Sequence, residues 1–216
     1  MADPTTGHLR VGRTARYHVL GEPGAAREVW YVLHGYGQLA ADFLADLAPI
    51  ARPERLIVAP EGLSRFYLQR GSGDVGASWM TREDRAVEIE DHVAWLDALH
   101  EHLLPRFRRE PTIHVLGFSQ GTATAGRWVA LGHARPVRLV LWGGWLPPDL
   151  DLDQCASKLR SLELTHVYGD GDSLITSKKL RAEETRLASH GIETRRLSFE
   201  GGHRLDEATL VRLVSE

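Results

Sequence analysis

The sequence predicts an α/β fold in three layers, with a mostly parallel sheet and helices on both of its faces. Short apolar runs that are typical of buried strands alternate along the chain with segments whose apolar residues recur at helical spacing. Several of these runs end directly at glycine, as strands do when they lead into tight turns. The 216 residues suit a single domain, residues 1–216, and are enough to bury a full core.

Composition and charge exclude several classes of function. Apolar residues make up 43% and charged residues 25% of the chain, which is ordinary for a globular protein. The formal net charge is −3 with no long run of one sign, so neither nucleic acid nor an anionic membrane surface is expected as a partner. No segment has the length of a membrane span, and residues 1–10 lack the apolar core of a signal peptide. The single cysteine, Cys155, excludes an intramolecular disulfide, so we expect a cytoplasmic protein without stable membrane insertion.

The first half of the chain opens with strands. Residues 9–20 contain two short apolar runs, which predict an opening hairpin or a bent edge strand. Residues 28–33 are almost continuously apolar, as expected of a strand covered on both faces. Residues 39–51 carry apolar side chains at helical spacing, and residues 55–60 form the next buried strand, which its proline ends. Residues 61–80 then form a long connection that is rich in glycine and aromatic residues.

The second half continues the alternation. Thr81 with Asp84 resembles a capping box, so we expect a long helix to begin there and to end at Pro105. The connection at residues 144–162 is too short for a separate lid domain, so an open, shallow site is expected. The remaining predicted elements are strands over residues 112–116, 137–142, 162–168 and 192–199, and helices over residues 122–130, 176–190 and 205–214. In such a sheet, ligands bind outside the carboxyl ends of the strands.

The sequence GFSQG at residues 117–121 lies between a predicted strand and a predicted helix. A G-x-S-x-G pattern in this context places its serine on a strained turn, because the two glycines let the strand and the helix approach closely. The turn presents the hydroxyl of Ser119 at the sheet edge, and the backbone N–H of Gln120 faces the same space. Ser119 is therefore a candidate nucleophile.

A serine hydroxyl needs a base, and the base needs a third group to hold it. The loops after the last two strands supply Asp172 and His203, each beyond a strand's carboxyl end. Most of the 11 histidines lie inside predicted strands or helices, where a histidine is usually structural, whereas His203 lies in a glycine loop at the right edge. Asp170 is the competing acid. It directly follows the strand and is expected to stabilise the turn, whereas Asp172 lies farther out and is favoured as the acid.

The sequence LHGYG at residues 33–37 predicts a glycine-rich turn that could aim the backbone N–H of Tyr36 at a developing oxyanion, together with the N–H of Gln120. His34 is expected to brace this turn, and a plain glycine turn is the alternative interpretation. Several aromatic and apolar side chains lie on segments able to line the site, although each could equally pack on the sheet edge. They are Tyr36, Phe66, Tyr67, Trp79, Trp145 and Leu174.

These motifs resemble the phospholipase/carboxylesterase family of α/β-hydrolases, which includes bacterial carboxylesterases and acyl-protein thioesterases. The resemblance covers the chain from about residue 28 to its end. It implies an α/β-hydrolase fold and a serine hydrolase without metal or cofactor that acts on carboxylic esters or thioesters. It also implies a triad of Ser119, Asp172 and His203, with the N–H groups of Tyr36 and Gln120 as oxyanion donors. Two positions depart from the family pattern, which usually has an aliphatic residue at position 36 and a proline at position 173.

The leading hypothesis is a hydrolase of carboxylic esters that works through an acyl-enzyme intermediate on a small-molecule or acyl ester. An acyl-thioesterase, a lysophospholipase or an acyltransferase could use the same triad. A ligand receptor that keeps the pocket without fast turnover is the alternative from another class, and the complete set of motifs disfavours it. The acyl-chain length and the oligomeric state are left open by the sequence.

Overall fold

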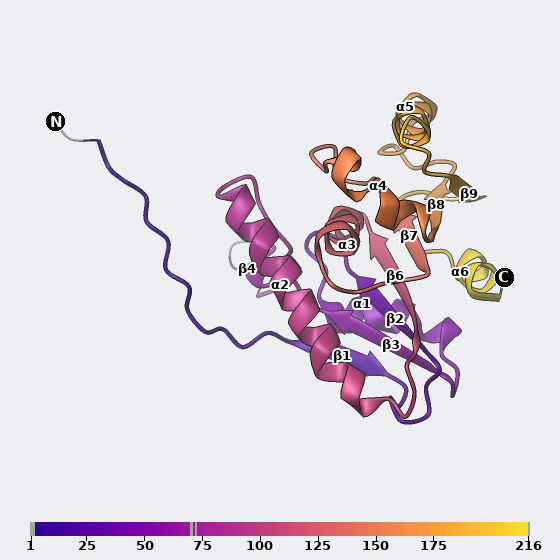
Figure 1. Ribbon diagram of the computed structural model, residues 1–216, viewed down its shortest axis with the longest axis horizontal. Helices are drawn as coiled ribbons and strands as arrows, with labels where there is room; N and C mark the ends of the chain where they lie inside the picture. Colours follow the sequence, from indigo (N-terminus) through magenta and orange to yellow (C-terminus); the bar gives the residue numbers. More distant parts are fainter. Residues whose placement is uncertain (1–2, 70, 72, 216) are drawn as a thin grey trace.

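The computed structural model describes residues 3–69, 71 and 73–215, and its centre is a seven-stranded sheet (Figure 1). The edge strand β1 pairs antiparallel with β3, and all other neighbours in the sheet pair in parallel. The predicted α/β class with a mostly parallel sheet is therefore confirmed. In spatial order the strands are β1 (Tyr17–Leu20), β3 (Arg55–Pro60), β2 (Glu28–Leu33), β6 (Thr112–Phe118), β7 (Arg138–Trp142), β8 (Glu163–Gly169) and β9 (Thr194–Phe199).

Helices cover both faces of the sheet, and each face has its own apolar core. One core includes side chains of α2 (Arg85–Leu103), α3 (Gln120–Leu131), α4 (Leu152–Arg160) and α5 (Ser177–Ala188). The other includes side chains of α1 (Ala40–Asp46), the short 3-10 helix η1 (Ala48–Ile50) and α6 (Glu207–Ser215). A second 3-10 helix, η2 (Leu104–Arg106), follows α2. No helix in the described residues is long and apolar enough to cross a membrane.

The central strand β2 shows how the sequence builds the two cores. Val29, Tyr31 and Leu33 belong to one core, whereas Trp30 and Val32 belong to the other. Successive side chains of a strand point to opposite faces of its sheet, so a continuous apolar run fills both cores at once. Because β2, β6, β7, β8 and β9 run in parallel, their carboxyl ends meet at one edge of the sheet. The loops with the candidate site residues begin at this edge.

Three segments differ from their prediction. Residues 9–16 form no strand in the structure and lead as an extended segment into β1, which is an edge strand as predicted (Figure 1). The connection at residues 61–80 contains a hairpin of β4 (Ser64–Tyr67) and β5 (Val75–Ser78), which is too short to leave a clear pattern of alternating apolar residues. The connection at residues 144–162 contains α4, whose first turn Asp151 caps by accepting a hydrogen bond from the N–H of Gln154.

The predicted capping box at Thr81 and Asp84 is wrong. Helix α2 begins at Arg85, and Asp84 has a left-handed backbone (φ 49°) without a capping hydrogen bond from its side chain. The N–H of Thr81 instead donates to the carboxylate of Glu88, one turn inside the helix. The loop before α2 is therefore held by the helix itself.

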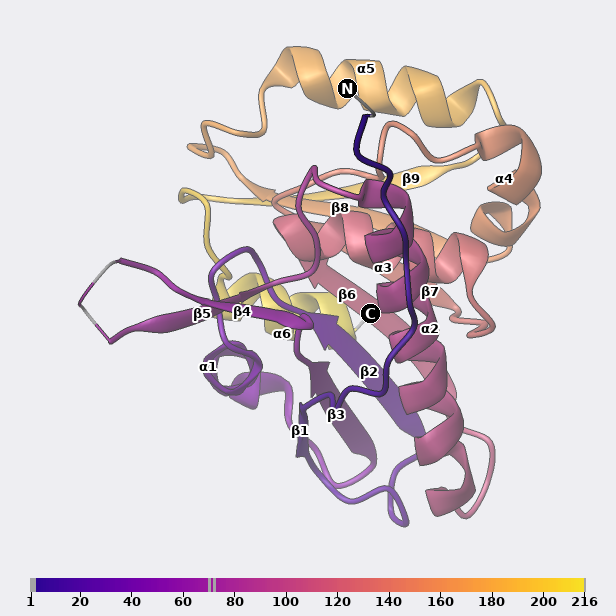
Figure 2. The same ribbon diagram turned by 90° about the vertical axis from the view of Figure 1, so that its left-hand side faces the viewer.

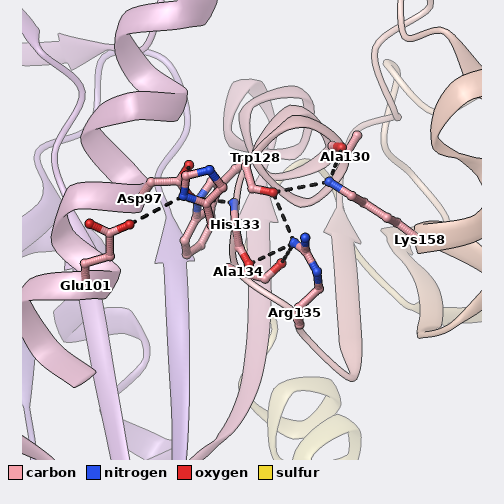
Figure 3. A network of polar contacts seen from close by, with 9 residues as sticks. Asp97, Glu101, Trp128, Ala130, His133, Ala134, Arg135 and Lys158 are labelled. Carbon is pink, nitrogen blue, oxygen red and sulfur yellow. Dashed lines mark hydrogen bonds and ion pairs between the residues drawn. The ribbon is translucent and has the colours of Figure 1, made fainter. Parts of the chain in front are cut away.

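Helix α3 packs beside α2, and a buried carboxylate joins the two (Figures 2 and 3). The Oδ1 atom of Asp97, on α2, accepts hydrogen bonds from the indole N–H of Trp128 and from the backbone N–H of His133, each at 2.8 Å. Both donors lie at the carboxyl end of α3 or just beyond it. This carboxylate fixes the far end of the helix that begins beside the candidate nucleophile.

Two basic side chains complete the carboxyl end of α3 (Figure 3). The Nζ atom of Lys158, on α4, donates to the carbonyl of Ala130 at 2.7 Å and to that of Gly132 at 3.2 Å. The Nη1 atom of Arg135 also donates to the carbonyl of Gly132, at 3.1 Å. The last carbonyls of a helix lack partners within the helix, and positive charge is stabilising there. The helix is thus held by α2, by α4 and by the loop that follows it.

Candidate active site

Ser119 lies on the turn between β6 and α3, with φ 53° and ψ −114°. A residue with a side chain rarely adopts this conformation, so the turn is strained as the sequence predicted. The two flanking glycines are required by close contacts. A Cβ atom on Gly117 would lie 2.3 Å from the carbonyl oxygen of Gly121, and one on Gly121 would lie 2.1 Å from that of Leu33. These contacts hold the end of β6, the start of α3 and the end of β2 together.

The loops after β8 and β9 bring Asp172 and His203 into contact. The Nδ1 atom of His203 lies 2.7 Å from the Oδ2 atom of Asp172, and the Oδ1 atom accepts a hydrogen bond from the N–H of Leu174 at 2.9 Å. The side chain of Asp172 is 1% exposed, whereas that of His203 is 29% exposed. The histidine is therefore held by a buried carboxylate and remains open to the solvent side.

Asp170, the competing acid, lies elsewhere on the same loop. Its backbone N–H donates to the carbonyl of Phe199 at 2.9 Å. Its side chain is exposed and makes no hydrogen bond with any residue of the described ranges. The expectation that its carboxylate stabilises the turn is wrong, because the backbone alone makes that contact.

The ring of His203 is placed beside the turn that carries Ser119. Its centroid is 5.0 Å from that of Phe118, the residue before Ser119. On another side lies Gly143, at φ 63°, where a Cβ atom would come within 3.0 Å of the Cε1 atom of His203. In the described part of the chain no hydrogen bond joins Ser119 to His203. Hydrogen bonds of this kind are often long before substrate binds, so the geometry is compatible with proton transfer.

His34 holds the glycine-rich turn after β2, as expected. Its Nε2 atom accepts a hydrogen bond from the N–H of Gly62 at 3.0 Å, so Nδ1 carries the proton and donates to the carbonyl of Gly35 at 2.8 Å. Burial lowers the pKa of His34, which keeps the ring neutral and preserves both bonds. The ring is fully buried and stacks on Trp79 at 4.9 Å. Both ring nitrogens of His34 thus form hydrogen bonds with backbone groups.

Two backbone donors next to Ser119 have no partner. Among the residues that the structure describes, none accepts a hydrogen bond from the N–H of Tyr36 or from that of Gln120. Gln120 is the first residue of α3, so its N–H has no acceptor within the helix. The turn with Tyr36 packs on the serine, because a Cβ atom on Gly35 would lie 3.3 Å from that of Ser119. Both N–H groups are therefore free to bind a ligand oxygen.

The side chain of Gln120 has a role that the sequence did not reveal. Its Oε1 atom accepts a hydrogen bond from the backbone N–H of Trp79 at 3.1 Å, and its Nε2 atom donates to the carbonyl of Met80 at 2.9 Å. It thereby ties the segment after β5 to the start of α3. No local pattern in the sequence predicts this contact, because the two segments are 40 residues apart.

The predicted lining residues divide into exposed and packed side chains. Tyr67 is 70% and Leu174 49% exposed, and Tyr36 is 62% exposed with its ring 5.1 Å from that of Phe66. Tyr36, Tyr67 and Leu174 are thus exposed, whereas Phe66, on β4, is half-buried.

The two tryptophans are packed instead. Trp79 is only 3% exposed, and its indole N–H donates to the carbonyl of His34 at 2.8 Å, so the expectation that it lines the site is wrong. The ring of Trp145 packs edge-on against His166 at 5.7 Å. A buried indole needs an acceptor for its N–H, and the backbone of the glycine-rich turn provides one for Trp79.

A cavity of about 410 Å³ lies beside Gln120, the residue that follows the candidate nucleophile. The residues that were predicted to line the site do not contribute to it. No cluster of three or more histidine, cysteine or acidic side chains suited to a metal ion occurs within the described ranges. The cavity is lined by Met80, Thr81, Arg82, Arg85, Gln120, Ala123, Thr124, Arg127, Pro147 and Pro148.

The sequence of this chain matches a known protein family over most of its length. A family model described as Phospholipase/Carboxylesterase matches residues 19–215. Esterase OVCA2 of Mus musculus is 36% identical over 104 residues, which are 45% of this chain and 44% of that protein. The chain thus matches less than half the length of this curated relative.

Two crystal structures share the fold. Acyl-protein thioesterase 2 of Zea mays superposes with a TM-score of 0.72 at 19% identity, over 94% of this chain and 97% of that one. The esterase PE8 superposes with a TM-score of 0.71 at 21% identity, over the same shares of the two chains, 94% and 97%. At these identities the likeness shows the arrangement of the elements.

Proposed function

The chain belongs to the phospholipase/carboxylesterase family, and on this basis we propose that it is a serine hydrolase that cleaves carboxylic esters. The observation that carries the proposal is the contact of 2.7 Å between His203 and the buried carboxylate of Asp172, beside a serine on a strained turn. A serine activated by a held histidine is the arrangement that acyl transfer requires. Ser119 is the nucleophile of this proposal.

In the proposed reaction, the Nε2 atom of His203 takes the proton of Ser119 as the Oγ atom attacks the carbonyl carbon of the ester. Asp172 keeps the proton of the imidazole on Nδ1 and stabilises the imidazolium that forms. The carbonyl oxygen becomes an oxyanion, and the free N–H groups of Tyr36 and Gln120 are the donors that stabilise it. When the tetrahedral intermediate collapses, His203 gives its proton to the departing alcohol, and an acyl-enzyme on Ser119 remains.

Water completes the proposed cycle by the same route. His203 takes a proton from the attacking water, the two backbone donors stabilise the second oxyanion, and the proton returns to the Oγ atom as the acid is released. The neutral, fully bonded ring of His34 takes no proton in this scheme. Its task is to keep the turn of Tyr36 in place.

A thioesterase is the second candidate. Acyl-protein thioesterase 2 of Zea mays shares the fold over nearly the whole chain, and a thioester carbonyl can react with the same triad. Lysophospholipids are further candidate substrates, because the family is named for phospholipases as well as carboxylesterases. A ligand receptor without turnover would have no use for two free donors beside a strained serine.

The proposal is tested by covalent labelling and by burst kinetics. A fluorophosphonate probe should label Ser119, and a p-nitrophenyl ester should give a burst of one product equivalent. The Ser119→Ala variant should lose labelling and about 10⁶-fold in kcat. Ser161→Ala is the matched control, because this serine lies before β8 at the opposite edge of the sheet, and it should keep full activity.

Activity of the purified Ser119→Ala protein above a few per cent of wild type would overturn the assignment. A panel of p-nitrophenyl esters from acetate to palmitate, run beside acyl-coenzyme A and a lysophospholipid, ranks the candidate substrates. A larger kcat/KM for the thioester than for an ester of the same acyl group would select the second candidate.

A further inference from the structure

The cavity beside Gln120 follows one face of α3. Gln120, Ala123, Thr124 and Arg127 line it, and residues at this spacing of three and four lie on the same side of a helix. The face therefore leads away from Ser119 along the helix axis. Ala123 is small, which leaves room above the helix, and the volume of about 410 Å³ is in the usual range for a ligand site.

The lining of this cavity is positively charged. Arg82, Arg85 and Arg127 contribute to it, and no acidic residue does. Arg85 and Arg127 share a single carboxylate, since the Oδ1 atom of Asp149 lies 2.7 Å from one guanidinium and 2.9 Å from the other. Arg82 forms no hydrogen bond or ion pair with the described residues. One negative charge thus faces three positive charges.

The nearby acidic residues Glu83, Asp84 and Glu88 lie outside the lining of the cavity. Asp84 pairs with His8 at 2.7 Å, and the carboxylate of Glu88 accepts the N–H of Thr81. Glu83 is exposed and lies outside the lining. Arg127, by contrast, is 4% exposed, and its burial lowers its pKa from the usual value, which reflects the cost of keeping a cation there.

A second observation points to a polar ligand. Thr124 lines the cavity and is 1% exposed, and its buried Oγ1 atom has no hydrogen-bond partner among the described residues. A buried hydroxyl group without a hydrogen-bond partner is destabilising. A ligand with oxygen acceptors in this cavity would satisfy Thr124 and the free donors of Arg82 together.

We propose that this cavity binds an anionic group of the substrate, a carboxylate or a phosphate, and so selects esters that carry a negative charge. The inference rests on the proposed function, because it places the anion on the same molecule as the reacting carbonyl. A guanidinium presents paired donors that match the oxygens of either anion.

The spacing along α3 sets the distance between the two parts of the substrate. Arg127 is seven residues beyond Gln120, about 10 Å along the axis, and its side chain leans back toward the start of the helix. The anion must therefore be separated from the carbonyl by several bonds. A six-carbon acyl group with a terminal carboxylate meets this requirement.

Two matched pairs of esters test the inference. Mono-p-nitrophenyl adipate differs from p-nitrophenyl hexanoate by a carboxylate in place of the terminal methyl group. Butanoyl glycerol 3-phosphate differs from monobutanoylglycerol by a phosphate on the alcohol side. In at least one pair, wild type should show a kcat/KM about 10-fold higher for the anionic ester, and the pair that does so identifies the anion.

Substitution of the arginines should remove this preference. Arg82→Gln and Arg85→Gln should each lower the ratio of kcat/KM, anionic over neutral ester, by about 10-fold. Arg109→Gln is the matched control, because it removes one exposed positive charge just before β6, at the opposite edge of the sheet, and should leave the ratio unchanged.

A wild-type ratio near one in both pairs would overturn the inference, as would an equal fall of the ratio in Arg109→Gln and Arg82→Gln. The proposed function fails in a different way. In that case no ester is cleaved and the fluorophosphonate leaves Ser119 unlabelled. Labelled Ser119 with cleavage of neutral esters and no preference for the anion would refute the anionic subsite alone.

Discussion

The imidazole of His203 and the carboxylate of Asp172 are joined by a contact of 2.7 Å, although they come from different loops. The second oxygen of this carboxylate is occupied by the N–H of Leu174. The carboxylate thus has a fixed orientation, in which its Oδ2 atom faces the imidazole. Asp172→Asn should lower kcat by about 10⁴-fold, because the amide would hold the wrong tautomer of His203. Steady-state kinetics with a p-nitrophenyl ester measures this loss.

Asp170→Asn is the matched control for that prediction. Its side chain is exposed and only its backbone contacts Phe199, so kcat should be unchanged and the free energy of unfolding should move by less than about 0.5 kcal/mol. If the large loss of kcat fell on Asp170 instead, the acid would have to be reassigned.

Replacement of His34 tests the support of the oxyanion turn. His34→Phe keeps a ring against Trp79 and leaves the N–H of Gly62 without its acceptor. It also removes one of the two donors to the carbonyl of Gly35, which still accepts from the N–H of Gln38 at 3.2 Å. We expect a loss of about 1–3 kcal/mol in the free energy of unfolding. We also expect kcat to fall by about 10- to 100-fold, less than the roughly 10²- to 10³-fold that loss of a whole oxyanion donor costs.

The control for His34→Phe is His114→Phe. His114 also stacks on a tryptophan, Trp30, at 4.5 Å, but it pairs with Arg138 in the first half of β6, away from the candidate site. This variant should keep the kcat of wild type. An equal fall of kcat in both variants would show that His34 has no specific link to the site.

Acid should destabilise the protein before its carboxylates titrate. Burial lowers the pKa of His92, His114 and His166 to about 4 each, whereas an unfolded histidine titrates near 6.5. Between these values the unfolded chain binds protons that the folded protein does not, so the free energy of unfolding falls as the pH falls from about 6.5 toward 4. Above pH 6.5 these groups contribute no pH dependence. Urea unfolding at pH 7.5, 6.0 and 5.0 measures the slope.

His166→Phe should make that slope shallower. Both ring nitrogens of His166 lack partners among the described residues, and its ring packs against Trp145, so a phenyl ring can replace it. The full effect of one such histidine is on the order of 2–3 kcal/mol at pH 4. A slope equal to that of wild type would contradict the assignment of the acid sensitivity to this buried ring.

Asp97 should matter for stability and not for chemistry. Asp97→Ala leaves the indole N–H of Trp128 and the backbone N–H of His133 without their acceptor, at a cost of about 1–3 kcal/mol for each buried donor. Glu101→Ala is the control, because its carboxylate is 64% exposed and lies 3.4 Å from His133. Thermal unfolding should separate the two variants, while kcat at 25 °C should match wild type in both.

Much of the fold could be predicted because strands and turns leave local signals. The runs at residues 28–33 and 55–60 coincide with β2 and β3, since strands buried on both faces are apolar throughout. The turn of Ser119 could be predicted for a related reason. Its glycines are required by contacts between neighbouring elements, and the chain order places those elements side by side.

The missed features depend on contacts between distant segments. The cavity of arginines unites Arg82 and Arg127, which no local pattern relates. An aromatic residue in a loop has the same sequence signal whether it lines a site or packs beneath it, and Trp79 proved to be packed. Helix α4 has buried apolar residues at helical spacing, but it is only nine residues long and lies within a short connection between two strands, so its periodic signal is weak.

The attachment of α3 at its carboxyl end has a consequence for the motions of the molecule. Asp97, Lys158 and Arg135 bind the last turn and the residues after it, so the helix cannot fray from that end without exposing a buried carboxylate. The hydrogen-bonded amides in the second half of α3 should therefore exchange slowly with deuterated solvent. The helix that follows Ser119 should thus be a rigid support for the candidate nucleophile.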